Sequence, residues 1–173
     1  MKKINTDIKY CEFNSPVGVI FVAASLKGLT DVGIRVAKGD FLKRLFMKYA
    51  QTPVYDKAFF SKQLVRFKRY FIGEQEVFAD LPLDMRGTDF EVKVWQALKG
   101  VQRGKTITYG ALALKAGSPR GARAVGGACS RNPLPILVPC HRVLPANGKL
   151  GNYTGGADTK KRLLEIEGVV VEI

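Results

Sequence analysis

A cysteine, a histidine and an arginine are adjacent at Cys140, His141 and Arg142, directly after Pro139, and His141 is the only histidine in the chain. A thiol is a strong nucleophile as the thiolate, a form that a nearby cation or imidazole favours. Histidine is also the side chain best able to move a proton at neutral pH. A lone cysteine is more often a small buried apolar residue, but these neighbours favour a reactive thiol at Cys140.

The backbone around this cysteine decides whether the thiol and the imidazole can meet. An apolar, strand-like run over residues 136–138 ends at Pro139, directly before the cysteine, and neighbouring residues of a regular strand point to opposite faces. Cys140 and His141 therefore cannot touch within such a strand. Either Pro139 introduces a local turn, or a bridging water carries the proton between the two side chains.

Two flanking segments supply further candidates. Asn132 lies in the stiff loop 131–135 and can present its side-chain amide near the cysteine. The glycine-rich segment 148–156 is either an ordinary loop or the backbone edge of a pocket for a flat ligand. A final predicted helix begins at Asp158 and runs through Glu167. This glutamate is either a solvated surface carboxylate or the group that orients His141.

The cysteine count and spacing argue against a disulfide framework and against a metal site. Three scattered cysteines and one histidine provide no paired zinc spacing. No apolar stretch is nearly as long as a membrane span, which requires about 20 consecutive apolar residues. Residues 1–7 lack the apolar core of a signal peptide. Apolar residues make up 46% of the chain, which suffices for a real core. We therefore expect a cytoplasmic protein in a reducing setting.

The charge distribution points to a polyanionic partner. Lysine and arginine total 28 against 15 acidic residues, a formal net charge of +13, and no acidic residue occurs between Glu91 and Asp158. A long segment of one sign attracts a polyanion such as nucleic acid. An anionic membrane fits less well, because the positive charges do not follow one amphipathic helix. The basic residues of the segment are Lys93, Lys99, Arg103, Lys105, Lys115, Arg120, Arg123, Arg131, Arg142 and Lys149.

Two short helices in this basic segment have the helix-turn-helix pattern. Thr108 is a credible N-cap for a helix over 109–115, which Gly117 ends. Ser118 then caps the next helix, with Pro119 at its first position. Small residues dominate residues 121–128, which permits close approach either to another helix or to a DNA groove.

The elements before this pair form a smaller α/β unit. Alternating apolar residues predict strands over 8–13, 17–24 and 29–36, and helical spacing predicts helices over 40–50 and 56–72, the second ended by Gly73. The aromatic residues of 56–72 suit core packing better than base stacking. Pro82 and Gly87 make residues 81–87 an extended linker, and Thr88 with Glu91 forms a capping box for the next helix. We expect domains at 1–80 and 88–173, joined by 81–87.

Several blocks of residues resemble the O6-alkylguanine-DNA alkyltransferase family, also called methylated-DNA–protein-cysteine methyltransferases. They are Pro139–Arg142, Arg123–Ala128, Asn132–Pro133, Gly151–Gly156 and Glu167–Gly168. The resemblance is specific over residues 88–168 and weaker over 1–80. It implies a small N-terminal α/β, ribonuclease-H-like domain followed by a mainly helical, winged helix-turn-helix C-terminal domain.

The resemblance also implies a role for each catalytic candidate. Cys140 would accept the alkyl group by in-line displacement, in a single irreversible turnover. His141 would deprotonate the thiol through a water, while Glu167 polarises His141 and Asn132 holds the network. Tyr109 would donate a proton toward guanine N3. No cofactor is required, and because no suitable histidine and cysteine set exists here, we expect no zinc in the N-terminal domain.

The partner implied by the resemblance is double-stranded DNA carrying O6-alkylguanine, bound through its minor groove. Arg123 would fill the gap left by a flipped-out nucleotide. The residues expected to bind the guanine are Val143 (through its carbonyl), Tyr153, Thr154 and Gly155. Those expected at the DNA, besides Tyr109 and Arg123, are Gly110, Ser118, Ala122, Ala124, Gly126 and Ala146. We expect a monomer in solution that associates with the nucleoid when bound; action on O4-alkylthymine and cooperative binding along DNA stay open.

Two other function classes fit parts of the sequence. A cysteine hydrolase or acyl-transfer enzyme would use Cys140 and His141 but would turn over repeatedly and would not need an acid-free basic half. A helix-turn-helix regulator would recognise a DNA sequence and would bind equally well without Cys140. Transfer of an alkyl group from damaged DNA to Cys140 discriminates against both.

Overall fold

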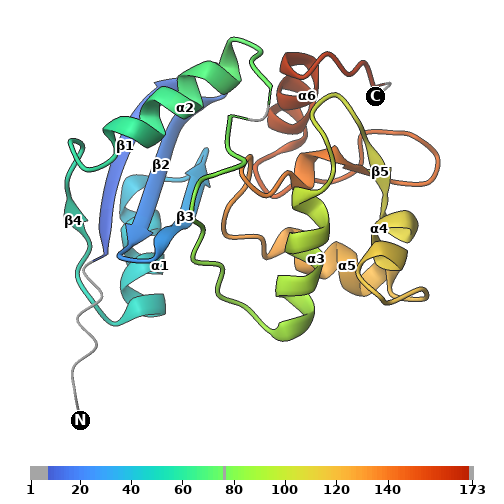
Figure 1. Ribbon diagram of the computed structural model, residues 1–173, viewed down its shortest axis with the longest axis horizontal. Coiled ribbons are helices and arrows are strands. Elements are labelled where there is room, and N and C mark those ends of the chain that lie inside the picture. Colours follow the sequence, from blue (N-terminus) through green and yellow to red (C-terminus); the bar gives the residue numbers. More distant parts are fainter. Residues whose placement is uncertain (1–7, 76, 172–173) are drawn as a thin grey trace.

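The computed structural model describes residues 8–75 and 77–171, and residues 1–7, on which the expectation of no signal peptide was based, lie outside the described residues. Two lobes lie side by side, one built around a sheet and one built mainly of helices (Figure 1). None of the helices within the described ranges is long and apolar enough to cross a bilayer. The fold class expected from the sequence, an α/β unit followed by a helix-turn-helix unit, is confirmed.

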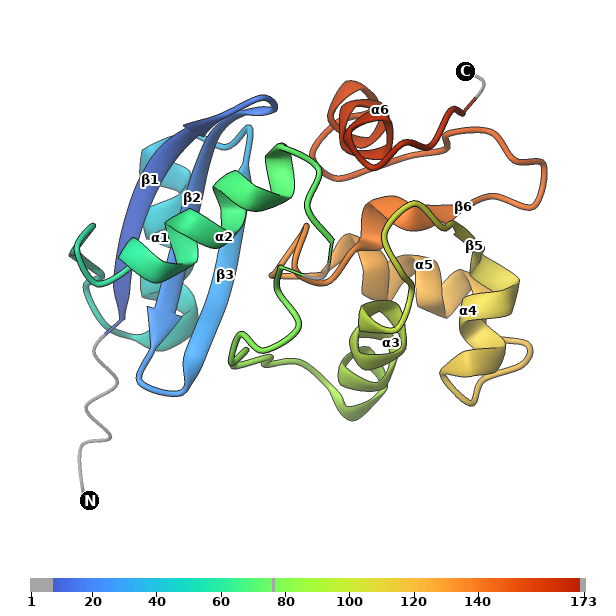
Figure 2. The same cartoon turned by 45° about the horizontal axis from the view of Figure 1, so that its top comes forward.

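The N-terminal lobe is a four-stranded sheet between two helices. The strands are β1 (Lys9–Ser15), β2 (Gly18–Ser25), β3 (Gly28–Ile34) and β4 (Val54–Tyr55), in the order β3-β2-β1-β4. β1, β2 and β3 pair antiparallel, whereas β4 pairs parallel with β1. Helices α1 (Lys38–Tyr49) and α2 (Ser61–Phe71) cover opposite faces of this sheet (Figure 2).

Alternation along the strands explains this sandwich. Tyr10, Phe21 and Ala23 point to one face and pack with Phe41 and Leu45 of α1. The residues between them point to the other face, where Cys11, Ile20 and Val22 join Phe67 and Tyr70 of α2 in a larger core. That larger core continues without a break into the helical lobe through Val94, Trp95 and Leu98. The two lobes therefore share one hydrophobic core.

The C-terminal lobe contains α3 (Asp89–Lys99), β5 (Ile107–Thr108), α4 (Tyr109–Lys115), α5 (Ala122–Ser130), the 3-10 helix η1 (Cys140–Arg142), β6 (Val143–Leu144) and α6 (Ala157–Ile166). The capping box of Thr88 and Glu91 and the N-cap of Thr108 are both confirmed by their hydrogen bonds. α4 and α5 form the predicted helix-turn-helix and pack on α3. β5 and β6 pair as a short parallel sheet.

Three local predictions are wrong. Ser118 does not cap a helix: its carbonyl accepts the Gly121 N–H at 2.8 Å, so Pro119 and Arg120 form a turn and α5 begins only at Ala122. The second helix of the N-terminal lobe begins at Ser61 rather than at residue 56, because the chain first completes β4 and a turn. Residues 136–138 are not a strand, since Ile136 has a φ of 75°, and the chain turns into η1 directly after Pro139.

Backbone hydrogen bonds tie the helical lobe and the connecting segment to the edge of the sheet. The Leu29 N–H donates to the Pro82 carbonyl at 2.9 Å, and the Asp84 N–H donates to the Leu29 carbonyl at 2.8 Å. Gly28 permits this approach, because a Cβ on it would lie 2.3 Å from the Pro82 oxygen. The Val32 N–H also donates to the Pro133 carbonyl at 2.7 Å. β3 thereby holds the loop that precedes Cys140.

Candidate active site

Cys140 lies at the first position of η1, with 8% of its surface exposed, and lines a cavity of about 260 Å³ between the two lobes. The predicted residues Asn132, Tyr153, Thr154 and Gly155 line the same cavity, as does Cys129 of α5. Burial raises the pKa of the Cys140 thiol above its ordinary value, and this outweighs Asn132, Tyr153 and Lys160, which favour the thiolate. The resting group is therefore a thiol, which must lose its proton before it can act as a nucleophile.

Asn132 holds the sulfur from the side of the preceding loop. Its side-chain amide donates to Cys140 Sγ at 3.1 Å and to the Val138 carbonyl at 2.7 Å. Its own Oδ1 accepts the Leu134 N–H at 2.9 Å, which fixes the orientation of the amide. The loop therefore presents the amide near the thiol, as the sequence predicts. Tyr153 also lies next to the thiol, and its hydroxyl favours the thiolate form of Cys140.

The tight turn of η1 sends His141 away from Cys140 and into the interior. Its Nε2 lies 2.7 Å from Glu167 Oε1, and the side chain is fully buried. Burial lowers the pKa of His141, whereas the hydrogen bond with Glu167 opposes the shift. The imidazole is therefore neutral near pH 7, with its proton on Nε2 facing the carboxylate. Its Nδ1 is buried and has no partner within the described residues, so it is available to accept a proton.

Glu167 is a buried carboxylate, 7% exposed, at the C-cap of α6, and the surface alternative considered from the sequence is wrong. Arg142 donates from Nε to Oε2 at 2.8 Å and from Nη2 to Oε1 at 2.9 Å. Burial by itself would raise the pKa of Glu167, but hydrogen bonds from His141 and Arg142 outweigh it and hold the pKa well below its usual range. The carboxylate is thus ionised and orients His141.

Two residues of this site escaped the sequence reasoning. Tyr70 of α2 donates its hydroxyl to Glu167 Oε1 at 2.7 Å, although its neighbours in sequence suggested core packing alone. Lys160 of α6 is fully buried and donates to the Val143 carbonyl at 2.7 Å. Burial lowers the pKa of Lys160 to about 8. Its basic neighbours Lys161 and Arg162 make the segment look like a solvated helix face, so no local signal could have identified it.

Most of the predicted DNA-facing residues lie in the helix-turn-helix, whereas Ala146 lies in the loop after β6. Arg123 and Ala124 of α5 are exposed, Ala122 and Gly126 are half-buried, and within the described ranges no ion pair or hydrogen bond engages the Arg123 side chain. Tyr109, at the start of α4, is half-buried, and burial followed by the nearby Cys129 and Cys140 raises its pKa. Gly110, Ser118 and Ala146 lie outside the Cys140 cavity. The Val143 carbonyl, expected to bind guanine, already accepts from Lys160.

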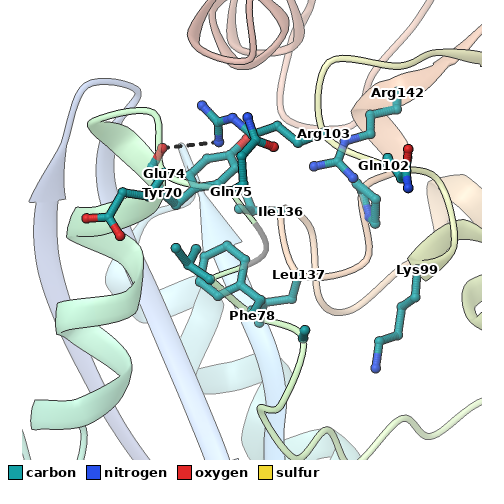
Figure 3. A pocket seen from close by; sticks show the side chains of 13 residues that line it. Tyr70, Glu74, Gln75, Phe78, Lys99, Gln102, Arg103, Ile136, Leu137 and Arg142 are labelled. Atoms are coloured by element: carbon teal, nitrogen blue, oxygen red, sulfur yellow. Dashed lines mark hydrogen bonds between the residues drawn. The ribbon is translucent and has the colours of Figure 1, made fainter.

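A second and larger cavity, of about 580 Å³, is lined by Pro139 and Arg142 but not by Cys140 (Figure 3). Its walls carry Tyr70 and Phe78 from the N-terminal lobe and Arg103, Leu137 and Arg142 from the C-terminal lobe. Residues of the 139–142 segment therefore line both cavities. Only the smaller one gives access to the thiol, so it is the candidate substrate pocket despite its size.

Comparisons with known proteins cover nearly the whole chain. Residues 8–85 match the model of the ribonuclease-like domain, and residues 89–169 that of the DNA binding domain, of 6-O-methylguanine DNA methyltransferase. A methylated-DNA–protein-cysteine methyltransferase of Methanosarcina acetivorans is 41% identical over 92% of this chain and 97% of its own, and one of Haemophilus influenzae is 37% identical over 95% and 88%. The crystal structure of Mycobacterium tuberculosis OGT in complex with DNA aligns with a TM-score of 0.80 at 38% identity, over 92% of each chain. This chain therefore belongs to the 6-O-methylguanine DNA methyltransferase family.

Proposed function

We propose that this protein repairs DNA by moving an alkyl group from guanine O6 to Cys140. The sulfur attacks the alkyl carbon in line with the O6–carbon bond. A carbon–sulfur bond forms, the carbon–oxygen bond breaks with its electron pair left on the guanine, and a proton returned to the base completes the restored guanine. The observation that carries the proposal is a buried thiol in a cavity, backed by a neutral histidine that a buried carboxylate orients.

The proton of Cys140 leaves toward His141. Because burial raises the pKa of the thiol, a base is needed, and Nδ1 of His141 is the atom free to serve. Cys140 and His141 share no direct hydrogen bond within the described residues, so a water bridges them. Glu167 keeps the other imidazole proton on Nε2, and Asn132 supports the developing thiolate through its amide. The product is a thioether, which does not hydrolyse, so each molecule acts once and needs no cofactor.

DNA approaches over α4 and α5. Arg123 is an exposed cation on the second helix of the pair and has no ion-pair partner among the described residues, which suits insertion into the minor groove in place of the flipped-out nucleotide. Tyr109 stays protonated and donates toward guanine N3. The base is bound by Tyr153, Thr154, Gly155 and the second lone pair of the Val143 carbonyl. The residues that line the DNA are Gly110, Ser118, Ala122, Ala124, Gly126 and Ala146. The substrate is thus O6-alkylguanine in duplex DNA, repaired by a monomer.

A duplex carrying one O6-methylguanine tests the proposal. The protein is incubated with a molar excess of the duplex, and its peptides are then mapped by mass spectrometry. We expect one methyl group on the Cys140 peptide, none on the peptides of Cys11 and Cys129, and a plateau at one methyl per protein. Cys140→Ala is the control and should leave the lesion in place. Lesion loss that continues beyond one equivalent, or that persists in Cys140→Ala, would contradict the proposal.

A further inference from the structure

Glu167 has a hydrogen-bond partner that comes from the other lobe of the molecule. Tyr70 lies on α2, is 2% exposed, and donates its hydroxyl to Glu167 Oε1 at 2.7 Å across 97 residues of sequence. His141 Nε2 meets the same oxygen at 2.7 Å. We propose that Tyr70 is a positioning residue for the alkyl transfer, through which the N-terminal lobe sets the basicity of His141. The proposal rests on the function proposed for Cys140.

The shared oxygen explains how a tyrosine that never touches substrate can act on the reaction. Oε1 of Glu167 accepts hydrogen bonds from Tyr70, His141 and Arg142, so its negative charge is shared among three donors. Each donor that stabilises the carboxylate reduces the charge available to stabilise a protonated imidazole. Tyr70 therefore helps to keep His141 neutral and its Nδ1 free. Burial raises the pKa of Tyr70 well above its ordinary value, so the hydroxyl remains a donor throughout the working pH range.

Arg103 fixes the tyrosine in this position. Its guanidinium lies 4.7 Å from the centre of the Tyr70 ring. Its Nη1 donates to the Tyr70 carbonyl at 3.2 Å and its Nη2 to the Ile166 carbonyl at 2.6 Å, one residue before Glu167. Figure 3 shows Tyr70, Arg103 and Arg142 together at the wall of the larger cavity. One arginine thus ties the donor and its acceptor into a single unit that spans both lobes.

Other charged and titratable groups also surround the pair. Arg142 of η1 contacts the Glu167 carboxylate directly, and Lys160 of α6 and Arg142 both oppose a positive charge on His141. Tyr153 and Cys140 face the site from the cavity side, and Arg103 from the loop before β5. Among these groups Tyr70 alone belongs to the N-terminal lobe. The substitution Tyr70→Phe removes only the hydroxyl. It leaves every other charge in place and preserves the aromatic packing of the ring against Phe71 and Phe78.

The ring signals of His141 provide a direct test that does not require activity. Because the chain has a single histidine, its imidazole resonances are unambiguous in a nuclear magnetic resonance pH titration. We expect Tyr70→Phe to raise the His141 midpoint by about half to one pH unit, the equivalent of one hydrogen bond. The matched control is Tyr49→Phe, which removes another buried hydroxyl from a carboxylate of the N-terminal lobe. Equal midpoints in all three proteins, or a His141 signal that does not titrate in any, would overturn the proposal.

Single-turnover kinetics connects this shift to the reaction. Because His141 must be neutral to accept the proton, a raised midpoint slows methyl transfer on the acid side. We expect a loss of about 3- to 10-fold below the wild-type midpoint and almost none well above it. Tyr49→Phe should show the wild-type dependence of the transfer rate on pH. In a Glu167→Gln background, Tyr70→Phe should slow the transfer little further. A uniform loss at every pH, or the full loss in that background, would make Tyr70 merely structural. Absence of transfer in the wild type would instead refute the proposed function.

Discussion

Each lobe of the molecule buries a carboxylate against a tyrosine hydroxyl. In the Asp31 cluster (Asp31, Lys48, Tyr49 and Arg86), the Tyr49 hydroxyl donates to Asp31 at 2.7 Å and Arg86 lies 4.9 Å from the centre of the Tyr49 ring. In the Glu167 cluster (Tyr70, Arg103, His141, Arg142 and Glu167), Tyr70 donates to Glu167 at 2.7 Å and Arg103 lies 4.7 Å from the ring centre. The same tyrosine, carboxylate and arginine arrangement occurs twice.

The two clusters differ in the group that the carboxylate holds besides its tyrosine. The other oxygen of Asp31 accepts from Lys48, whose side chain is 26% exposed, so that cluster ends at solvent. Glu167 instead holds His141, whose second nitrogen is buried and unpaired within the described residues. His141 also directly follows Cys140, the proposed alkyl acceptor. A buried pair of a tyrosine and a carboxylate therefore has only a structural role by itself. The same arrangement can support proton transfer when its carboxylate orients a histidine that can still accept a proton.

Neutralising each carboxylate tests this comparison most strongly. Glu167→Gln should slow methyl transfer by about 10²- to 10⁴-fold, because a glutamine amide can donate to Nε2 and turn the imidazole to the wrong tautomer. Asp31→Asn should leave the rate of the folded protein unchanged. Single-turnover rates at saturating protein measure both. If the two variants lost the same activity, the clusters would not differ in function.

Lys160, which is buried near the Glu167 cluster, should make the stability of the fold depend on pH. The pKa of Lys160 is lowered to about 8, below its unfolded value, so the folded state binds fewer protons between about pH 8 and 10 and gains stability as the pH rises. Relative to Lys160→Met, the wild type should gain up to about 3 kcal/mol across this range. Urea unfolding at several pH values measures the gain. A constant difference would show that Lys160 is charged normally in the fold, and Lys48→Met is the matched control.

The cations of the two lobes should differ in their effect on DNA. Arg123→Ala should slow transfer from duplex DNA by about 10- to 100-fold, because without the side chain nothing offsets the cost of extruding the base. It should not affect transfer from free O6-methylguanine base. Lys62→Ala removes an exposed cation from α2 and should change neither rate. An equal loss on the free base would place Arg123 in the chemistry instead of at the duplex.

The smallest expected effect concerns the Asp31 cluster itself. Tyr49→Phe should lower the free energy of unfolding by about 1–2 kcal/mol, because Asp31 loses the hydrogen bond from the Tyr49 hydroxyl. Methyl transfer at 25 °C should keep its wild-type rate. Thermal unfolding and the single-turnover assay, run on the same preparation, measure the two quantities. A change in rate without a change in stability would mean that the N-terminal cluster also communicates with the thiol.

Signals that act within a few residues predicted much of the structure. Thr88 with Glu91, and Thr108, begin helices where the sequence places them, because a cap hydrogen bond joins residues only three apart. Gly73 and Gly117 follow helix ends with positive φ, which glycine adopts without strain. The adjacency of Cys140, His141 and Arg142 likewise pointed to the segment whose cysteine lines the candidate substrate pocket. The prediction that Ser118 caps a helix was wrong, because a serine before a proline suits a turn as well as a helix start.

The sequence alone therefore determined the candidate reactive segment, the basic helix pair and most helix ends, whereas only the tertiary structure decided which groups surround the thiol and His141. The sequence left Glu167 either on the surface or beside His141, and it contained no sign of a role for Tyr70 or Lys160. The Glu167 contacts join residues 25, 26 and 97 positions apart, so no local pattern encodes them. They exist because one hydrophobic core packs α2 and α6 on either side of η1, and burial there, not residue type, sets the protonation of Cys140, His141 and Lys160.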